Sequence, residues 1–149
     1  MDFDDFDTRA ASSEGAKMHV KQPVTGEPIL NEGLPCMVHI RGVESSEAVD
    51  EVQAIVRAQA KRSKDDPRDH HDDLLEMAMP LVLGFENMQR RDPKTGKSRD
   101  LTPSKDDVAW FLNLQRAKNG RSDQVSFVEQ VVKFSSDRAN YLGNVSGGS

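Results

Sequence analysis

Four adjacent residues, His70 to Asp73, are the side chains of this 149-residue chain whose types most directly suggest chemistry. Imidazole and carboxylate groups are ligands that divalent metal ions accept, so the run HHDD resembles part of a metal site. Neighbouring residues at a helix start point in different directions, however, and only His19 and His39 remain elsewhere as further histidines. We therefore interpret the aspartates as the acidic first turn of a helix, and we predict no metal and no cofactor.

Cys36 is the only cysteine in the chain, and a histidine, His39, follows it closely. A Cys/His nucleophile is conceivable from these residue types, but a small thiol on a strand or in a core explains the cysteine better. A single cysteine allows neither an internal disulfide nor a cysteine-built metal site. The sequence has no glycine-rich phosphate loop, no G-x-S-x-G elbow and no H-E-x-x-H helix. We therefore expect a protein that is not an enzyme.

The segment 87–102 combines turn-forming residues with the one clearly basic stretch of the chain. Its basic residues are Arg90, Arg91, Lys94, Lys97 and Arg99. Such a stretch could bind phosphates or an acidic protein surface, and the acidic N-terminal segment could fold onto it. No aromatic residue lies among them, and a net charge of −5 with a pI near 5.4 argues against a general nucleic-acid binder. We predict a solvated loop or exposed hairpin and no nucleic-acid partner.

The composition is polar for a chain of this length, with 30% charged, 36% hydrophobic and 5% aromatic residues. Aspartates alternate with Phe3 and Phe6 at the start, and clustered like charge with low hydrophobicity favours disorder. We predict a disordered acidic tail over 1–24, a single domain over 25–143 and a flexible tail over 144–149. Alternatively, the acidic-aromatic segment docks in a basic, apolar groove of a partner.

The most apolar run is Leu74–Phe85, LLEMAMPLVLGF, and its apolar residues recur at helical intervals of three and four. Met77, Met79 and Leu83 widen the apolar stripe, which indicates a helix buried in a core or covered by a partner. The run is too short to cross a bilayer, no longer apolar stretch exists, and the start of the chain does not read as a secretory signal. We expect a soluble cytosolic protein with no membrane partner.

Weaker patterns place the remaining elements around this run. Alternation over 36–41 predicts a short half-buried strand, and Ile29 and Leu30 could add a partner strand to make a small hairpin. Capping residues and apolar periodicity predict three further helices, which cover residues 45–62, 102 to about 120, and 122 or 123 to 142.

These elements predict a mainly α fold: about four helices in a small orthogonal bundle, preceded by a short strand or β-hairpin, with disordered N- and C-terminal tails. The predicted core contains the apolar residues of each helix. They are Val52, Ile55, Val56, Leu74, Leu75, Ala78, Leu81, Val82, Phe85, Val108, Phe111, Leu112, Val128, Val131 and Val132.

Several segments occur in a characteristic order: a T-G-x-P turn, the strand MVHIRG, the apolar run ending LVLGFEN, the helix start LTPSKDDVAWFLN and the final helix ending DRANYLGN. This order resembles that of small proteins from tailed bacteriophages and prophages, encoded near the tail-tube and tape-measure proteins. The resemblance covers roughly residues 25–144. Phe85 stands where the family usually has tryptophan, and the acidic N-terminal extension and residues 64–73 depart from the family pattern.

The resemblance implies a non-catalytic tail assembly chaperone, which binds tape-measure and tail-tube proteins in the bacterial cytoplasm during siphophage tail morphogenesis. Two alternatives are a structural virion protein of the tail or head-tail junction, and an adaptor that binds a host factor through its acidic tail. For a partner-facing surface we predict the aromatic residues of the last two helices and two adaptable methionines, which could instead simply pack the core. These residues are Trp110, Phe127, Phe134, Tyr141, Met77 and Met79.

Overall fold

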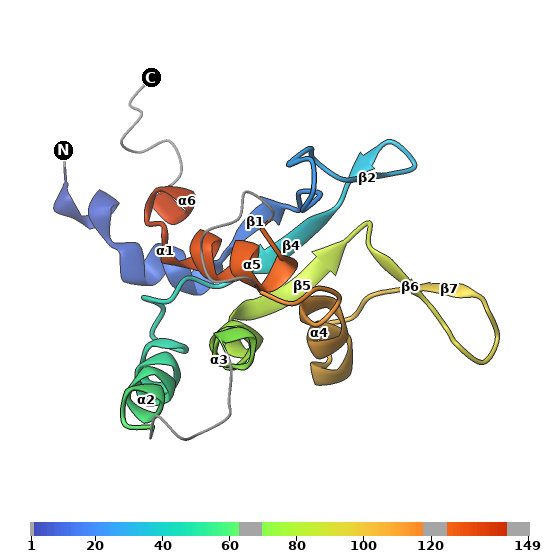
Figure 1. The fold of residues 1–149 in the computed structure, drawn as a ribbon. Coiled ribbons are helices and arrows are strands. Elements are labelled where there is room, and N and C mark those ends of the chain that lie inside the picture. The colour runs from blue at the N-terminus through green and yellow to red at the C-terminus, as the bar shows by residue number, and fades with distance from the viewer. Residues whose placement is uncertain (1, 63–69, 118–124, 143–149) are drawn as a thin grey trace.

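A three-stranded antiparallel sheet forms the centre of the protein (Figure 1). The computed structural model describes residues 2–62, 70–117 and 125–142. The middle strand, β4 (Met37–Ile40), pairs with β1 (Ala16–His19) on one side and β5 (Val82–Glu86) on the other. The alternation over 36–41 therefore predicted the central strand of the fold correctly.

The prediction of a mainly α bundle is wrong. The described residues form three small sheets as well as six α-helices, and 20% of these residues are in strands, so the fold is mixed α/β. Each strand has only two to five residues. An alternation of that length is too short to stand out against turn-rich sequence, which is why helical periodicity dominated the prediction.

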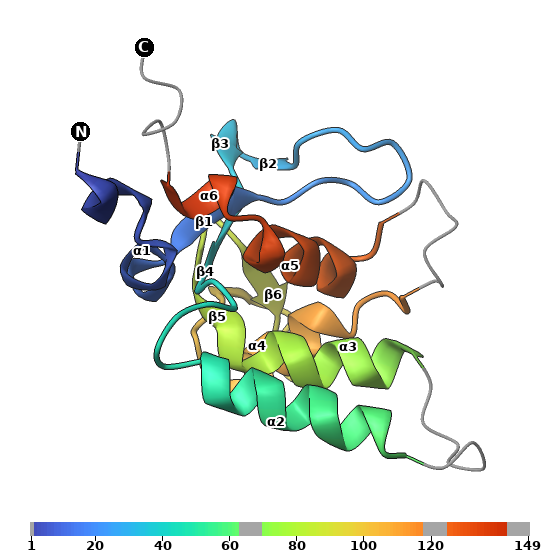
Figure 2. The ribbon, with the colours of Figure 1, turned by 90° about the vertical axis from the view of Figure 1, so that its left-hand side faces the viewer.

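Helices pack against the sheet and against one another (Figure 2). Helix α5 lies against β4 and contacts both α3 and α4, while α2 packs on α3. Their bounds are Val49–Ala60 for α2, His70–Ala78 for α3, Lys105–Leu112 for α4 and Phe127–Ser136 for α5. The sequence predicted α2 within two to four residues, whereas α4 is shorter than predicted, and the expected boundary at 119–123 lies outside the described residues.

The caps of α4 and α5 explain where these helices begin. The third predicted helix was expected to start at residue 102, but Ser104 caps α4, and its hydroxyl accepts a hydrogen bond from the Asp107 amide. Ser126 caps α5, and its amide donates to the Glu129 carboxylate in a reciprocal capping box. Both arrangements satisfy amides that the first helical turn leaves without partners.

The run Leu74–Phe85 is not one helix. Helix α3 ends at Ala78, a short 3₁₀ turn covers Met79–Leu81, and β5 follows directly. Pro80 lies at the change, because it has no amide to continue the helical hydrogen bonds. After the 3₁₀ turn the apolar residues belong to strand β5, in which Phe85 lies opposite Val38 of β4.

The N-terminal segment is also ordered where the sequence predicted a disordered tail. A 3₁₀ turn, η1 (Phe3–Phe6), precedes α1 (Thr8–Glu14), and β1 then pairs with the sheet. The Asp7 carboxylate caps α1 by accepting from the amides of residues 9 and 10. A long-range hydrogen bond joins the Gly42 amide to the Ser12 carbonyl, and α1 also contacts α6 (Ala139–Leu142). The flexible C-terminal tail predicted over 144–149 lies outside the described residues.

Two hairpins extend beyond the central sheet. The first pairs β2 (Leu30–Asn31) with β3 (Leu34–Pro35), and the second pairs β6 (Gln89–Arg91) with β7 (Ser98–Asp100). The second hairpin confirms the prediction of an exposed hairpin for the basic segment. It lies at the opposite end of the molecule from α1, so the acidic N-terminal segment does not fold onto it within one chain (Figure 1).

The hydrophobic core joins the sheet to α3, α4 and α5. Phe111 is its largest buried side chain, with the Phe127 ring stacked on it at 4.8 Å and the Phe85 ring meeting it edge-on at 5.5 Å. Most of the predicted core residues are buried or pack against the core, but Val56 is 45% exposed. The predicted list left out the core residues of the sheet and the loops, which are Met18, Val20, Cys36, Val38, Ile40, Ala48 and Leu101.

Candidate functional site

A groove with a volume of about 460 Å³ opens between the two hairpins and the helices α4 and α5. We call it the hairpin groove. Its lining is mainly apolar and aromatic, with a few amides and two arginines. The lining residues are Val20, Ile29, Leu30, Asn31, Cys36, Asn87, Met88, Gln89, Arg90, Arg91, Ser98, Leu101, Trp110, Phe111, Leu114 and Phe127. A concave, mostly apolar surface with few polar groups is typical of a binding site.

Exposed leucines mark the rim of the hairpin groove. Leu30 on β2 is 59% exposed and Leu114, after the end of α4, is 47% exposed. Leu34 on β3 is 56% exposed and lies on the same hairpin as Leu30. Single exposed leucines are ordinary on protein surfaces, but leucines gathered around an aromatic groove favour an interaction surface.

The β6–β7 hairpin is held against α4 by a buried carboxylate, that of Asp107, which is 1% exposed. The Arg99 guanidinium donates two hydrogen bonds to it at 2.7 and 2.9 Å, and Arg90 donates a third at 3.1 Å. The Thr102 amide and hydroxyl each donate at 2.8 Å. These donors, the Arg99 pair above all, hold the pKa of Asp107 well below its usual range. We call this arrangement the Asp107 clamp.

The clamp also positions the aromatic side of the groove. The Arg90 guanidinium lies over the Trp110 ring, 4.6 Å from its centroid, in a cation–π contact. Two of the five basic residues of the hairpin, Arg90 and Arg99, therefore share the Asp107 carboxylate as an ion-pair partner within the fold. Arg91 remains exposed, and no ion pair involving it occurs within the described ranges.

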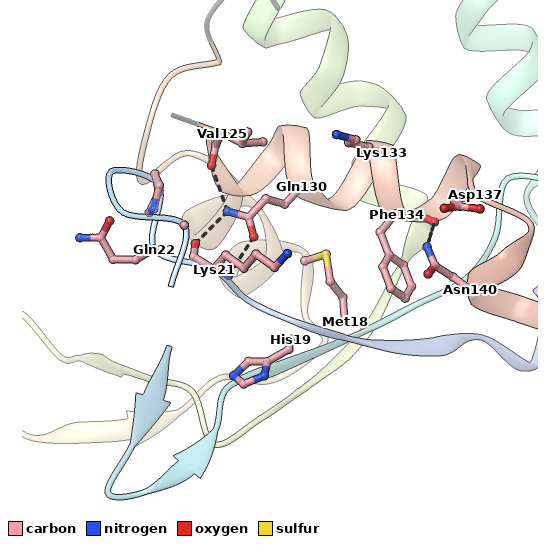
Figure 3. Close-up of a pocket in the computed structure, with 12 residues that line it drawn as sticks. Met18, His19, Lys21, Gln22, Val125, Gln130, Lys133, Phe134, Asp137 and Asn140 are labelled. Atoms are coloured by element: carbon pink, nitrogen blue, oxygen red, sulfur yellow. Dashed lines mark hydrogen bonds between the residues drawn. The ribbon is translucent and has the colours of Figure 1, made fainter. Parts of the chain in front are cut away.

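A second hollow, of about 440 Å³, lies between the end of β1 and α5, and we call it the β1–α5 cleft (Figure 3). The Gln130 side chain crosses it, accepting from the Lys21 amide and donating to the carbonyls of Lys21 and Val125. The side-chain amide of Asn140 donates to the Phe134 carbonyl at 2.9 Å. These hydrogen bonds join the chain after β1 to α5, so we interpret the cleft as structural.

The four aromatic residues predicted to face a partner do not form one surface. Trp110 and Phe127 line the hairpin groove, whereas Phe134 lines the β1–α5 cleft and meets the Tyr141 ring edge-on at 5.9 Å. Burial raises the pKa of Tyr141. The structure thus brings together two of the four and separates them from the other pair.

Met77 lies in the last turn of α3, and Met79 begins the 3₁₀ turn that leads to β5. Both are partly buried and pack against the hydrophobic core. Neither lines the hairpin groove or the β1–α5 cleft. Their role in binding a partner stays a prediction, while the packing accounts for their apolar character.

The residues that first suggested chemistry have structural partners instead. His71 is buried: its Nε2 lies 2.8 Å from the Asn113 amide oxygen, and its Nδ1 accepts from the Ala117 amide at 3.0 Å. The Cys36 thiol donates to the Asn87 carbonyl, and burial raises its pKa, which disfavours the reactive thiolate. In the described part of the chain, no group of histidine, cysteine and acidic residues has the arrangement of a metal site.

Sequence reasoning missed Leu30, Leu114 and Arg91 as groove residues. Leu30 was placed in a possible partner strand and Leu114 within a predicted helix, and neither was predicted to face a partner. One usable signal was that Leu30 lies between prolines and glycines with no periodic apolar partner, which is unusual for a buried leucine. The groove itself brings together four segments from distant parts of the chain, and no local pattern predicts that.

Comparison of the chain with protein-family models, curated proteins and solved structures finds no match. None of the described helices is long and apolar enough to cross a membrane.

Proposed function

We propose that this protein is a non-catalytic assembly chaperone of a tailed bacteriophage, which binds the tape-measure and tail-tube proteins in the bacterial cytoplasm before the tail forms. The hairpin groove is the observation that carries the proposal. Together with the order of sequence segments, it supports a helper that covers apolar segments of another protein. Phe134, Tyr141, Met77 and Met79 lie outside this groove and are not part of the proposed docking surface.

The client of such a groove is an apolar segment of the tape-measure protein. A tape-measure protein is long and apolar, and its segments need cover until tube subunits polymerise around it. Trp110 and Phe127 provide aromatic surface, and the leucines of the rim provide apolar surface that is exposed to water in the absence of a client. Binding this client transfers apolar surface of both partners out of water, which is the main driving force for association.

Co-expression with the tape-measure protein encoded beside it tests the proposal. The wild-type protein should keep the tape-measure protein in the soluble fraction and co-purify with it. The double variant Leu30→Asp, Leu114→Asp places charges on two exposed rim positions, so we expect the fold to persist and the recovered complex to fall at least roughly tenfold. The matched control is Val56→Asp, because Val56 is similarly exposed but lies on α2 outside the groove.

Two results would contradict the proposal. The first is a tape-measure protein that is soluble alone and does not co-purify with the wild-type chain. The second is a double variant that binds as well as the Val56→Asp control. Mass spectrometry of purified particles separates the chaperone from a virion component, since a chaperone is absent from particles and a structural subunit is present in stoichiometric amount.

A further inference from the structure

We propose that the N-terminal segment of one copy of this protein docks in the hairpin groove of a second copy, so that the protein self-associates head to tail. The segment is Asp2–Asp7, DFDDFD, which we call the acidic-aromatic segment. The inference goes beyond client binding and does not depend on it, because it requires only the purified chain.

The acidic-aromatic segment has the exposure of a docking motif that lacks its partner. Phe3 is 88% exposed and Phe6 is 40% exposed, with their rings 6.0 Å apart on the 3₁₀ turn η1. Neither ring lines the hairpin groove or the β1–α5 cleft of its own chain. Leaving two phenylalanines in water costs free energy that a groove on another molecule would recover.

Charge complementarity selects the hairpin groove as the receptor. The segment contains four aspartates and no basic residue, and they contribute −4 to the chain's formal net charge of −5. The only charged residues lining the hairpin groove are Arg90 and Arg91, and Lys94 and Lys97 follow on the same hairpin. The β1–α5 cleft is less suitable, because its lining includes Asp137 beside the lysines.

The two arginines that line the groove differ in whether they already have an ion-pair partner. Arg90 is already bound to Asp106 and Asp107, whereas Arg91 is exposed and makes no ion pair with the described residues. Arg91 is therefore the cation that an incoming aspartate can reach. The aromatic lining of Trp110 and Phe127 would receive the phenylalanine rings, since aromatic pairs add edge-to-face or stacked contacts to the burial of area.

The position of the two surfaces makes the contact intermolecular. The acidic-aromatic segment precedes α1 at one end of the molecule, and the β6–β7 hairpin lies at the other end (Figure 1). A contact between two different patches of identical chains is heterologous, so it produces a ring or an open chain of copies rather than a two-fold dimer. Self-association of this kind would cover the groove until an apolar client replaces the segment.

Sedimentation velocity of the purified chain, over a range of protein and salt concentrations, tests this inference. We expect concentration-dependent association that weakens as salt screens the aspartate–arginine attraction. Phe3→Ala with Phe6→Ala should weaken association at least roughly tenfold, and so should Arg91→Glu. The control for Arg91→Glu is Lys94→Glu, which makes the same charge change on the same hairpin outside the groove lining and should weaken association much less.

A charge exchange separates a direct contact from a general effect of net charge. Asp4→Arg with Asp5→Arg should weaken self-association of that variant at least roughly tenfold, as Arg91→Glu does for the other. An equimolar mixture of the two variants should associate again. The unchanged acidic segment of the Arg91→Glu variant meets the unchanged groove of the other variant, and the arginine-bearing segment meets the glutamate-bearing groove. A chain that stays monomeric at all concentrations would overturn the inference, as would unchanged association after Phe3→Ala with Phe6→Ala, or a mixture that fails to associate.

This inference and the proposed function fail in different ways. If sedimentation shows only monomers while co-expression still yields a complex with the tape-measure protein, the groove binds clients but not the acidic-aromatic segment. If the chain self-associates through the segment and no client co-purifies, the groove serves assembly of the protein with itself. Each variant is first compared with wild type by thermal unfolding, so that loss of association is measured on folded protein.

Discussion

Each end of this protein contains an arginine–carboxylate contact, but the two contacts differ in burial. At the hairpin end, the Asp107 carboxylate is 1% exposed and receives hydrogen bonds from two arginines and Thr102. At the N-terminal end, Glu44 binds the Thr8 hydroxyl at 3.0 Å and Arg138 at 2.6 Å, and the Arg138 side chain is 70% exposed.

This difference indicates which end is preformed and which is adaptable. A buried carboxylate must keep its partners, because losing one leaves a charge without solvent. An exposed ion pair contributes little and is screened by salt. The hairpin groove is thus built on a rigid frame, whereas the acidic-aromatic segment precedes a helix whose ionic attachment is weak. A rigid receptor and an adaptable segment are the two parts that head-to-tail docking needs.

Removing the Asp107 clamp should lower the free energy of unfolding more than any other change proposed below. Asp107→Ala leaves Arg90 and Arg99 without their shared carboxylate, and we expect a loss of about 3 kcal/mol in the free energy of unfolding. Urea denaturation measures it. Asp106→Ala is the matched control, because Asp106 also binds Arg90 but its side chain is 85% exposed, and its loss should cost below about 1 kcal/mol. Equal losses in the two variants would contradict a buried clamp.

Acid should remove the stability that the Asp107 clamp contributes, because the folded protein holds this carboxylate in its charged form. The folded-state pKa of Asp107 lies below its unfolded value of about 3.9, so its contribution is fully present above that pH and is lost as pH falls through the folded pKa. Glu44 has a lowered pKa as well, chiefly through Arg138, and shares this direction. Asp107→Asn should therefore lose less stability than wild type between neutral pH and about pH 3. Identical acid sensitivity in urea titrations would refute the assignment.

A side chain added at Gly42, near the N-terminal end, should destabilise the fold by an intermediate amount. A Cβ on Gly42 would lie 2.5 Å from the Ser12 hydroxyl and 3.2 Å from the Tyr141 ring, so Gly42→Ala must shift α1 or α6. We expect a cost of about 2 kcal/mol, measured by thermal unfolding. Gly84→Ala is the control, since nothing lies within 4 Å of its added Cβ. A neutral Gly42→Ala would show that α1 is not packed there.

The smallest loss of stability should come from breaking the ion pair between Glu44 and Arg138. Glu44→Gln removes the charge that binds Arg138, and we expect a loss below about 1 kcal/mol that disappears at high salt. Urea denaturation at low and high salt measures both. A loss as large as that of Asp107→Ala would mean that the two ends are equally fixed, and the comparison between them would fail.

Sequence reasoning predicted the parts of this fold whose patterns are local. The strand around Val38 and the exposed hairpin between Asn87 and Thr102 follow from alternation and turn chemistry, whereas α2 begins at Val49 and not at the serine that was expected to cap it. Leu74–Phe85 was misread, because buried strands and buried helices are both continuously apolar and periodicity cannot separate them. Pro80 was the residue that could have decided between them.

The candidate site was predicted only in part. Trp110 and Phe127 were chosen as aromatic residues and do line the groove. Phe134 lies about two turns further along α5 than Phe127, where it lines the β1–α5 cleft and contacts the Tyr141 ring. The Asp107 clamp could not be predicted, since its acid follows one of its arginines by 17 residues and the other by 8. Only tertiary packing shows that this carboxylate is buried.

The most direct test of the central proposal is hydrogen exchange on the co-purified complex with the tape-measure protein, compared with the chain alone. Binding in the hairpin groove should slow amide exchange at β2, β6 and the end of α4, while the outer helix α2 stays unchanged and serves as the internal control. Protection confined to α2 or to the β1–α5 cleft, or no protection at all in a stable complex, would contradict the account.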